Sequence, residues 1–241
     1  MDEKNNSALV PRPSNAVEKA KPGAKRVLAG MVAETLALAE ARLLVKLSPN
    51  VSPLLESWYQ RGNASYFGKN GFPQDYVEAA KWFRMAAEQG HATAQNQLGY
   101  CYECGVGVSQ DYQEAVKWYR KSADQGDEAA QYNFGACYAK GLGVQQDYEE
   151  AGKWITKSAE QGDVTAQFNL GFLYREGLGV PSDVRQAFKW FRLAADQGHE
   201  NAAKQFAALV GSMPLSEFQT ASELYREFKN SHLVRQKSLN K

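Results

Sequence analysis

Three cysteines are the side chains in this sequence that are best suited to metal or redox chemistry. Cys101 and Cys104 form a Cys-x-x-Cys pair, and Cys137 follows Cys101 by 36 residues. Three neighbouring thiolates could bind zinc, but structural zinc sites take four ligands. No fourth ligand is apparent, because the three histidines fall in predicted loops or in the C-terminal tail. We therefore expect free, half-buried thiols and no metal, while a redox role for the three cysteines stays open.

The remaining reactive side chains form no recognisable catalytic set. None of the three histidines lies in a nucleophile–base–acid pattern. The Gly-x-Gly-Val segment at 105–108 is not a phosphate-binding loop, because no strand precedes it and no Lys-Ser or Lys-Thr follows. The sequence therefore predicts no enzyme and no cofactor.

A 36-residue period is the most informative pattern in the chain. Four tryptophans keep this spacing, namely Trp82, Trp118, Trp154 and Trp190. A fixed period of this size is typical of stacked-repeat proteins, whose units bury their apolar faces only against neighbouring units. We expect the tryptophans to pack in the core rather than to form a ligand cage. Adjacent repeats are separated by about 10 Å, so a disulfide between Cys101 and Cys137 is excluded.

Each unit is predicted to be a helix–turn–helix. In residues 91–126, the first helix ends at the Gly-x-Gly-Val turn, whose glycines permit positive φ. Asp111 is expected to cap the second helix, with Glu114 in an Asp version of the capping box. Gly126 then ends that helix. Four units follow one another, at 54–90, 91–126, 127–162 and 163–198.

The repeated run resembles the Sel-one-like repeat family, a relative of the tetratricopeptide repeat. The matching residues are Gly107, Val108, Asp111, Ala115, Trp118, Ala123, Gly126, Ala130, Phe134, Gly135 and Tyr138. The resemblance implies an all-α fold, a right-handed α-solenoid of helix-turn-helix repeats with helical caps. It also implies an adaptor, scaffold or regulator of protein complexes.

The two ends of the chain differ from the repeats in composition. Residues 1–23 are rich in Asn, Pro, Lys and Ser and are predicted to be disordered. Residues 24–50 contain an amphipathic helix, which either caps the first repeat or mediates dimerisation or partner binding. The repeats occupy 51–210. Residues 211–241 hold a capping helix at 215–230 and a basic tail.

The charge balance excludes several classes of partner. The net charge is +1, which gives no case for nucleic acid or for a membrane surface. The basic tail is either a solvated end or a weak docking element for an acidic partner. No secretory signal and no bilayer-spanning stretch are visible, so a cytoplasmic location is expected.

The first helices of the repeats are expected to line the concave face of the solenoid. The positions left over from core packing vary between repeats and are rich in aromatic residues, which is typical of binding hot spots. The predicted protein-binding residues are Asn96, Tyr100, Glu103, Tyr132, Phe168, Phe172 and Arg175. As an alternative, Phe168 and Phe172 pack against the C-terminal helix and fill the groove from within.

The sequence therefore favours a scaffold or adaptor that binds a protein or peptide. A small-molecule-binding or hydrolytic repeat enzyme of the cell-wall type is the alternative from a different class. A purely structural oligomer is the third. The protein is expected to be a monomer or a weak homodimer held through the helix at 24–47.

Overall fold

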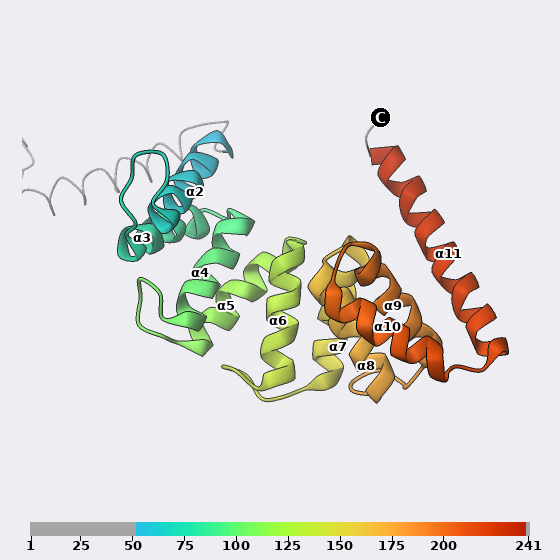
Figure 1. Ribbon diagram of the computed structural model, residues 1–241. Helices are drawn as coiled ribbons and strands as arrows, with labels where there is room; N and C mark the ends of the chain where they lie inside the picture. The colour runs from blue at the N-terminus through green and yellow to red at the C-terminus, as the bar shows by residue number, and fades with distance from the viewer. Residues whose placement is uncertain (1–51, 240–241) are drawn as a thin grey trace, which may run out of the picture. The chain divides into compact units, whose positions relative to one another are not determined.

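The computed structural model describes residues 52–239, with side chains as far as residue 231, and this part of the chain consists of α-helices and connecting turns (Figure 1). The predicted disordered segment and the helix at 24–50 lie outside the described residues. The helices are α2 Ser52–Phe67, α3 Tyr76–Glu88, α4 Ala92–Cys104, α5 Tyr112–Asp124, α6 Glu128–Lys140, α7 Tyr148–Gln161, α8 Val164–Glu176, α9 Val184–Asp196, α10 Glu200–Ser212 and α11 Leu215–Leu239.

Consecutive helices pack against one another from α3 to α10. Helices α4, α6 and α8 are the first helices of three repeats, and each packs against the second helix of its own repeat and of the preceding one. This nearest-neighbour packing makes the chain an all-α solenoid, as the 36-residue period predicts. Helix α11 departs from the pattern, because it packs on α9.

Aspartate and histidine side chains cap the N-termini of helices α3 to α10. The Asp111 carboxylate accepts a hydrogen bond from the backbone N–H of Glu114 at 3.0 Å, which confirms the predicted cap. Glu114 does not complete a capping box, because its carboxylate pairs with Lys117 at 2.5 Å and the Asp111 N–H donates to the Tyr102 carbonyl. The caps of the first helices were not predicted from the sequence; they are His91, Asp127, Asp163 and His199.

The second glycine of each Gly-x-Gly-Val turn allows neighbouring repeats to touch. Gly107 has φ of +75°, and a Cβ built on it would lie 2.0 Å from the Tyr76 carbonyl oxygen at the start of α3. Gly143 and Gly179 meet the next two second helices in the same way. Only glycine therefore satisfies both the left-handed backbone and the close approach.

The interior is built from small residues at the helix crossings and large ones between them. Ala115 is fully buried, and Gly99 leaves room for the ring of Tyr119. Trp118 and Trp190 are 9% and 2% exposed, which places both in the core as predicted. The core prediction does not hold for Trp82 and Trp154, which are only half-buried; the Trp154 indole N–H donates to Glu150 at 3.1 Å.

Glutamine side chains form a ladder that the sequence analysis missed. The Gln95 amide donates to the Ala87 carbonyl at 3.0 Å and accepts from the Gln125 amide at 2.7 Å. The same contacts recur one and two repeats later through Gln131 with Gln161 and Gln167 with Gln197. Because Gln95 is 5% exposed, these bonds satisfy polar groups that water cannot reach.

The C-terminal helix covers α9 along a mixed apolar and polar seam. The Phe218 ring lies 5.7 Å from the Phe188 ring, and the Phe228 ring lies 5.1 Å from the Trp190 ring. At the end of α9, Asp196 accepts hydrogen bonds from α11, including one from Lys229 at 3.0 Å. Helix α11 continues to Leu239, beyond the predicted end at residue 230.

Candidate protein-binding surface

The first helices α4, α6 and α8 carry all seven predicted binding residues. Asn96 of α4 is only 8% exposed, and its amide oxygen accepts a hydrogen bond from Asn133 of α6 at 2.9 Å. Tyr132 of α6 is half-buried, and its hydroxyl accepts from Asn169 of α8 at 3.2 Å. Burial raises the pKa of Tyr132, so it stays neutral. These side chains connect successive first helices to one another.

The two phenylalanines of α8 lie between α8, α9 and the start of α10. The Phe168 ring stacks on the His199 imidazole at 4.3 Å and meets the Phe172 ring edge-on at 4.9 Å. Phe172 also contacts Phe191 of α9 at 5.3 Å.

Arg175 stacks over the Phe172 ring. Its guanidinium carbon lies 4.4 Å above the ring centre, and its Nη1 donates to the Gln205 amide oxygen of α10 at 2.6 Å. Its Nε also pairs with Glu176 at 2.7 Å. Phe168 and Phe172 are both half-buried, so each stays partly accessible. The result is an aromatic surface whose side chains are already held in place.

Tyr100 and Glu103 of α4 differ in how far they reach the surface. Tyr100 is 40% exposed. The neighbouring Cys104 thiol and Tyr66 hydroxyl raise the pKa of Tyr100 to about 12. Glu103 instead accepts a hydrogen bond from the Tyr119 hydroxyl of α5 at 2.6 Å, which ties it to the core. Of the predicted set, Tyr100 is the most exposed hydrophobic side chain.

One polar position of this surface escaped the sequence analysis. Residues 97, 133, 169 and 205 are Gln, Asn, Asn and Gln, one on each first helix from α4 to α10. In the structure Asn133, Asn169 and Gln205 bind the predicted residues of neighbouring repeats. Their 36-residue phase was the available signal. The predicted face was defined by positions whose residues vary between repeats. This position carries a carboxamide in each of these repeats and was therefore not included.

The cysteines lie beneath and beside this surface as free thiols. Cys101 and Cys137 are buried, and burial raises their pKa values to about 11 and about 12. Both thiols are therefore protonated near neutral pH, which makes them poor nucleophiles. Cys104 is exposed. Among the described residues, no three His, Cys, Asp or Glu side chains gather as a metal site requires.

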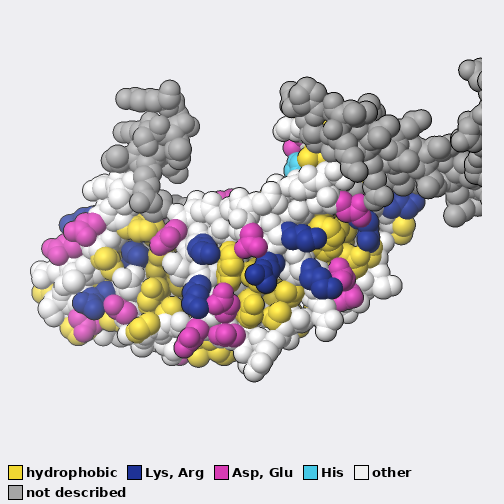
Figure 2. All heavy atoms as spheres, turned by 180° about the vertical axis from the view of Figure 1, so that it is seen from behind, with side chains coloured by type: hydrophobic (Ala, Val, Ile, Leu, Met, Phe, Trp, Pro, Cys, Tyr) yellow, Lys and Arg dark blue, Asp and Glu magenta, His cyan; other side chains and the backbone are white. Residues whose placement is uncertain are grey.

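The face of the molecule seen from behind in Figure 2 has no patch in which charges of one sign dominate. Figure 2 shows basic and acidic side chains interspersed with apolar ones. Ion pairs on the second helices include Lys117–Glu114 and Lys153–Glu150. No helix between residues 52 and 239 has both the length and the apolar character of a membrane span.

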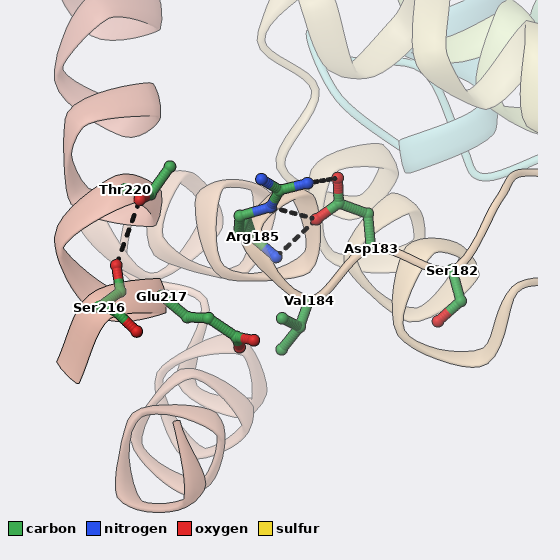
Figure 3. A pocket seen from close by; sticks show the side chains of 7 residues that line it. All are labelled: Ser182, Asp183, Val184, Arg185, Ser216, Glu217 and Thr220. Carbon is green, nitrogen blue, oxygen red and sulfur yellow. Dashed lines mark hydrogen bonds and ion pairs between the residues drawn. The ribbon is translucent and has the colours of Figure 1, made fainter. Parts of the chain in front are cut away.

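A cavity of about 400 Å³ lies where α9 begins, facing α11 (Figure 3). Val184 lines this cavity and is equivalent, by the 36-residue period, to Tyr76, Tyr112 and Tyr148. The backbone of each of those tyrosines contacts a turn glycine of the next repeat. No such turn follows α10, so this space is left open. Its main charges are partly neutralised, since Arg185 pairs with Asp183 at 3.2 Å. The cavity is thus a consequence of ending the repeats.

Comparisons with known proteins agree with this architecture. The Sel1 repeat family model matches residues 58–91, 92–127, 128–163 and 164–199. A Sel1 repeat protein from Oxalobacter formigenes is 32% identical, with a TM-score of 0.61, over 72% of this chain and 70% of that one. A protective antigen present in uropathogenic Escherichia coli strains, which displays an SLR fold, is 30% identical, with a TM-score of 0.68.

The second match covers 85% of this chain but 48% of the antigen, so this chain spans about half the length of that protein. None of the curated proteins matches. The matched family segments are consecutive and together extend over more than half of the sequence. The chain is therefore a member of the Sel1 repeat family.

Proposed function

We propose that this protein is a scaffold or adaptor that binds a protein or peptide on its first-helix face, here defined as Tyr100, Tyr132, Phe168, Phe172 and Arg175. Sel1 repeat proteins generally act as scaffolds for protein interactions. The observation that carries the proposal is the arrangement around Phe172. This half-buried ring contacts both Arg175 and Phe191, so little conformational entropy is lost when a partner covers its exposed part.

The chemistry of the first-helix face favours a partner with apolar side chains and some negative charge. Tyrosine and phenylalanine bury a large area with only two rotatable bonds each. Arg175 is half-exposed and already stacked, and its guanidinium pairs well with carboxylates. The half-exposed carboxamides of Asn133 and Asn169 lie between these anchors and add hydrogen-bonding groups.

A double variant of the first-helix face tests the proposal. Peptides would first be selected from a random library against the wild-type protein, and their affinities then measured by biolayer interferometry. Tyr100→Ser combined with Phe172→Ser should weaken binding by at least about tenfold, since hot-spot residues contribute about 2 kcal/mol or more each. Tyr148→Ser serves as the matched control, because Tyr148 is 37% exposed but lies on a second helix.

Circular dichroism would confirm that both variants keep the wild-type helix content. Unchanged affinity in the folded double variant would exclude the first-helix face as the binding site. An equal loss of affinity in Tyr148→Ser would show that peptide binding does not depend on the first-helix face.

A further inference from the structure

A second, smaller cavity of about 250 Å³ opens to solvent between α9, α10 and α11, whose residues line it. Three phenyl rings form its apolar wall, one from each helix. Phe188 lies 4.9 Å from Phe206 and 5.7 Å from Phe218. This cavity is separate from the first-helix face, because none of its lining residues belongs to α4, α6 or α8.

The cavity exists because the last repeat is incomplete. Leu98, Phe134 and Leu170 share one phase of the repeat and are at most 3% exposed, since the second helix of each repeat covers them. Phe206 has the same phase on α10 but is only half-buried. The helix that follows α10 packs along α9, so the space that a second helix would occupy is only partly filled.

Two arginines supply the polar part of the cavity. Arg192 lies 5.0 Å over the Phe206 ring, and its Nε donates to Asp196 at 2.8 Å. That carboxylate is shared with Lys229 at 3.0 Å. Arg226 also lines the cavity, and it has no ion pair within the described part of the chain. The cavity therefore combines an apolar wall with an excess of positive charge.

We propose that this cavity binds the C-terminal residue of a partner polypeptide. An aromatic or branched aliphatic side chain fills the space between the phenyl rings. The adjacent α-carboxylate receives hydrogen bonds from Arg226 and from the Nη atoms of Arg192, because a guanidinium offers a planar fork suited to a carboxylate. A volume of about 250 Å³ is smaller than typical small-molecule sites of about 300–1,000 Å³ and suits a single side chain.

The test uses the whole chain and four probes measured by isothermal titration calorimetry. They are a short N-acetylated peptide that ends in phenylalanine with a free carboxylate, its C-terminal amide, a peptide with an internal Asp-Phe pair and an amide end, and free phenylacetate. The free-carboxylate peptide should bind, and the amide should bind at least about tenfold more weakly, because a charged hydrogen bond contributes roughly 1.5–3 kcal/mol.

Variants then locate the binding. Arg226→Gln should weaken binding of the free-carboxylate peptide about tenfold, and the wild-type side chain has no ion pair among the described residues that this change would break. Ser222→Leu should block the cavity by filling it. Arg120→Gln is the control, because Arg120 pairs with Asp124 on α5 as Arg192 pairs with Asp196 on α9.

Equal binding of the peptide acid and amide, or no binding by either, would overturn the proposal. So would phenylacetate binding as tightly as the peptide, or preferential binding of the internal Asp-Phe peptide. Loss of binding in Arg120→Gln would place the site elsewhere. The first-helix face is tested independently, since Tyr100 and Phe172 line no part of this cavity.

Discussion

Individual glycines differ in role even where their backbone conformations are alike. Gly107 and Gly126 both have positive φ, at +75° and +92°. A Cβ at Gly126 would meet nothing within 4 Å, whereas one at Gly107 would collide with the Tyr76 carbonyl. Gly126→Ala should therefore cost only the left-handed strain of about 1–2 kcal/mol. Gly107→Ala should cost clearly more, because the contact between repeats must also shift.

Urea denaturation of the two variants measures this difference directly. Their midpoints should separate, with Gly107→Ala the less stable. Coincident midpoints would mean that the turn moves away from α3 without loss, and that the repeats do not depend on this contact.

Trp118 provides the second prediction at this scale. Its side chain is 9% exposed, and the Lys121 ammonium lies 3.9 Å from its ring centre. Trp118→Ala should lower the free energy of unfolding by about 3–5 kcal/mol, because it leaves a large cavity between two repeats. A thermal melt followed by circular dichroism checks this. An unchanged midpoint would contradict the placement of this indole in the core.

At the level of elements, the contact of α11 with α9 changes the environment of one lysine. Lys153 is exposed and pairs with Glu150 at 2.9 Å. Lys189 has the same phase but is 7% exposed, with its ammonium 4.1 Å from the Trp190 ring centre and 4.8 Å from that of Phe228. Burial lowers the pKa of Lys189 to about 8, although Glu160 and Asp183 act in the opposite direction.

This shift predicts an alkaline gain in stability. The pKa of Lys189 is lower in the folded protein than its ordinary value of 10.5, so the unfolded chain binds more protons between about pH 8 and pH 10.5. The free energy of unfolding should therefore rise with pH through that window. Lys189→Met should remove this rise, and Lys153→Met should retain it. Urea unfolding at pH 7.5 and pH 9.5 measures the free energy of unfolding of the wild type and of both variants. An equal change with pH in all three proteins would show that folding does not disfavour the charged form of Lys189.

For the whole molecule, nearest-neighbour packing predicts that damage at one end stays local. Removing residues 215–241 deletes α11 and exposes Phe188 and Trp190 on α9. In a linear array, stability is a sum of repeat and interface terms. Hydrogen exchange should therefore accelerate most in α9 and α10 and least in α4 and α5. Uniform acceleration along the chain would indicate a single cooperative unit instead.

Much of the fold was predictable because equivalent positions in every repeat have the same packing role. The turn glycines, the Asp111 cap and the buried Trp118 all follow from the 36-residue phase and from elementary backbone chemistry. Part of the candidate site was less predictable. The sequence placed Asn96 and Phe168 on an accessible face, yet Asn96 is bonded to the next repeat and Phe168 stacks on His199. Contacts between consecutive first helices depend on how closely the repeats approach, which one repeat alone does not specify.

The sequence by itself determined the repeat, its period, its turns and its family, because local periodicity dictates which residues must be buried. The tertiary structure decided what happens where the period stops. Helix α11 could continue the array beside α10 or lie along α9, and only the three-dimensional packing shows that it lies along α9. That choice buries Lys189 and leaves Phe206 partly uncovered beside Arg226. Its physical reason is long-range contact between Phe188, Phe218, Trp190 and Phe228, which joins residues that no repeating spacing connects.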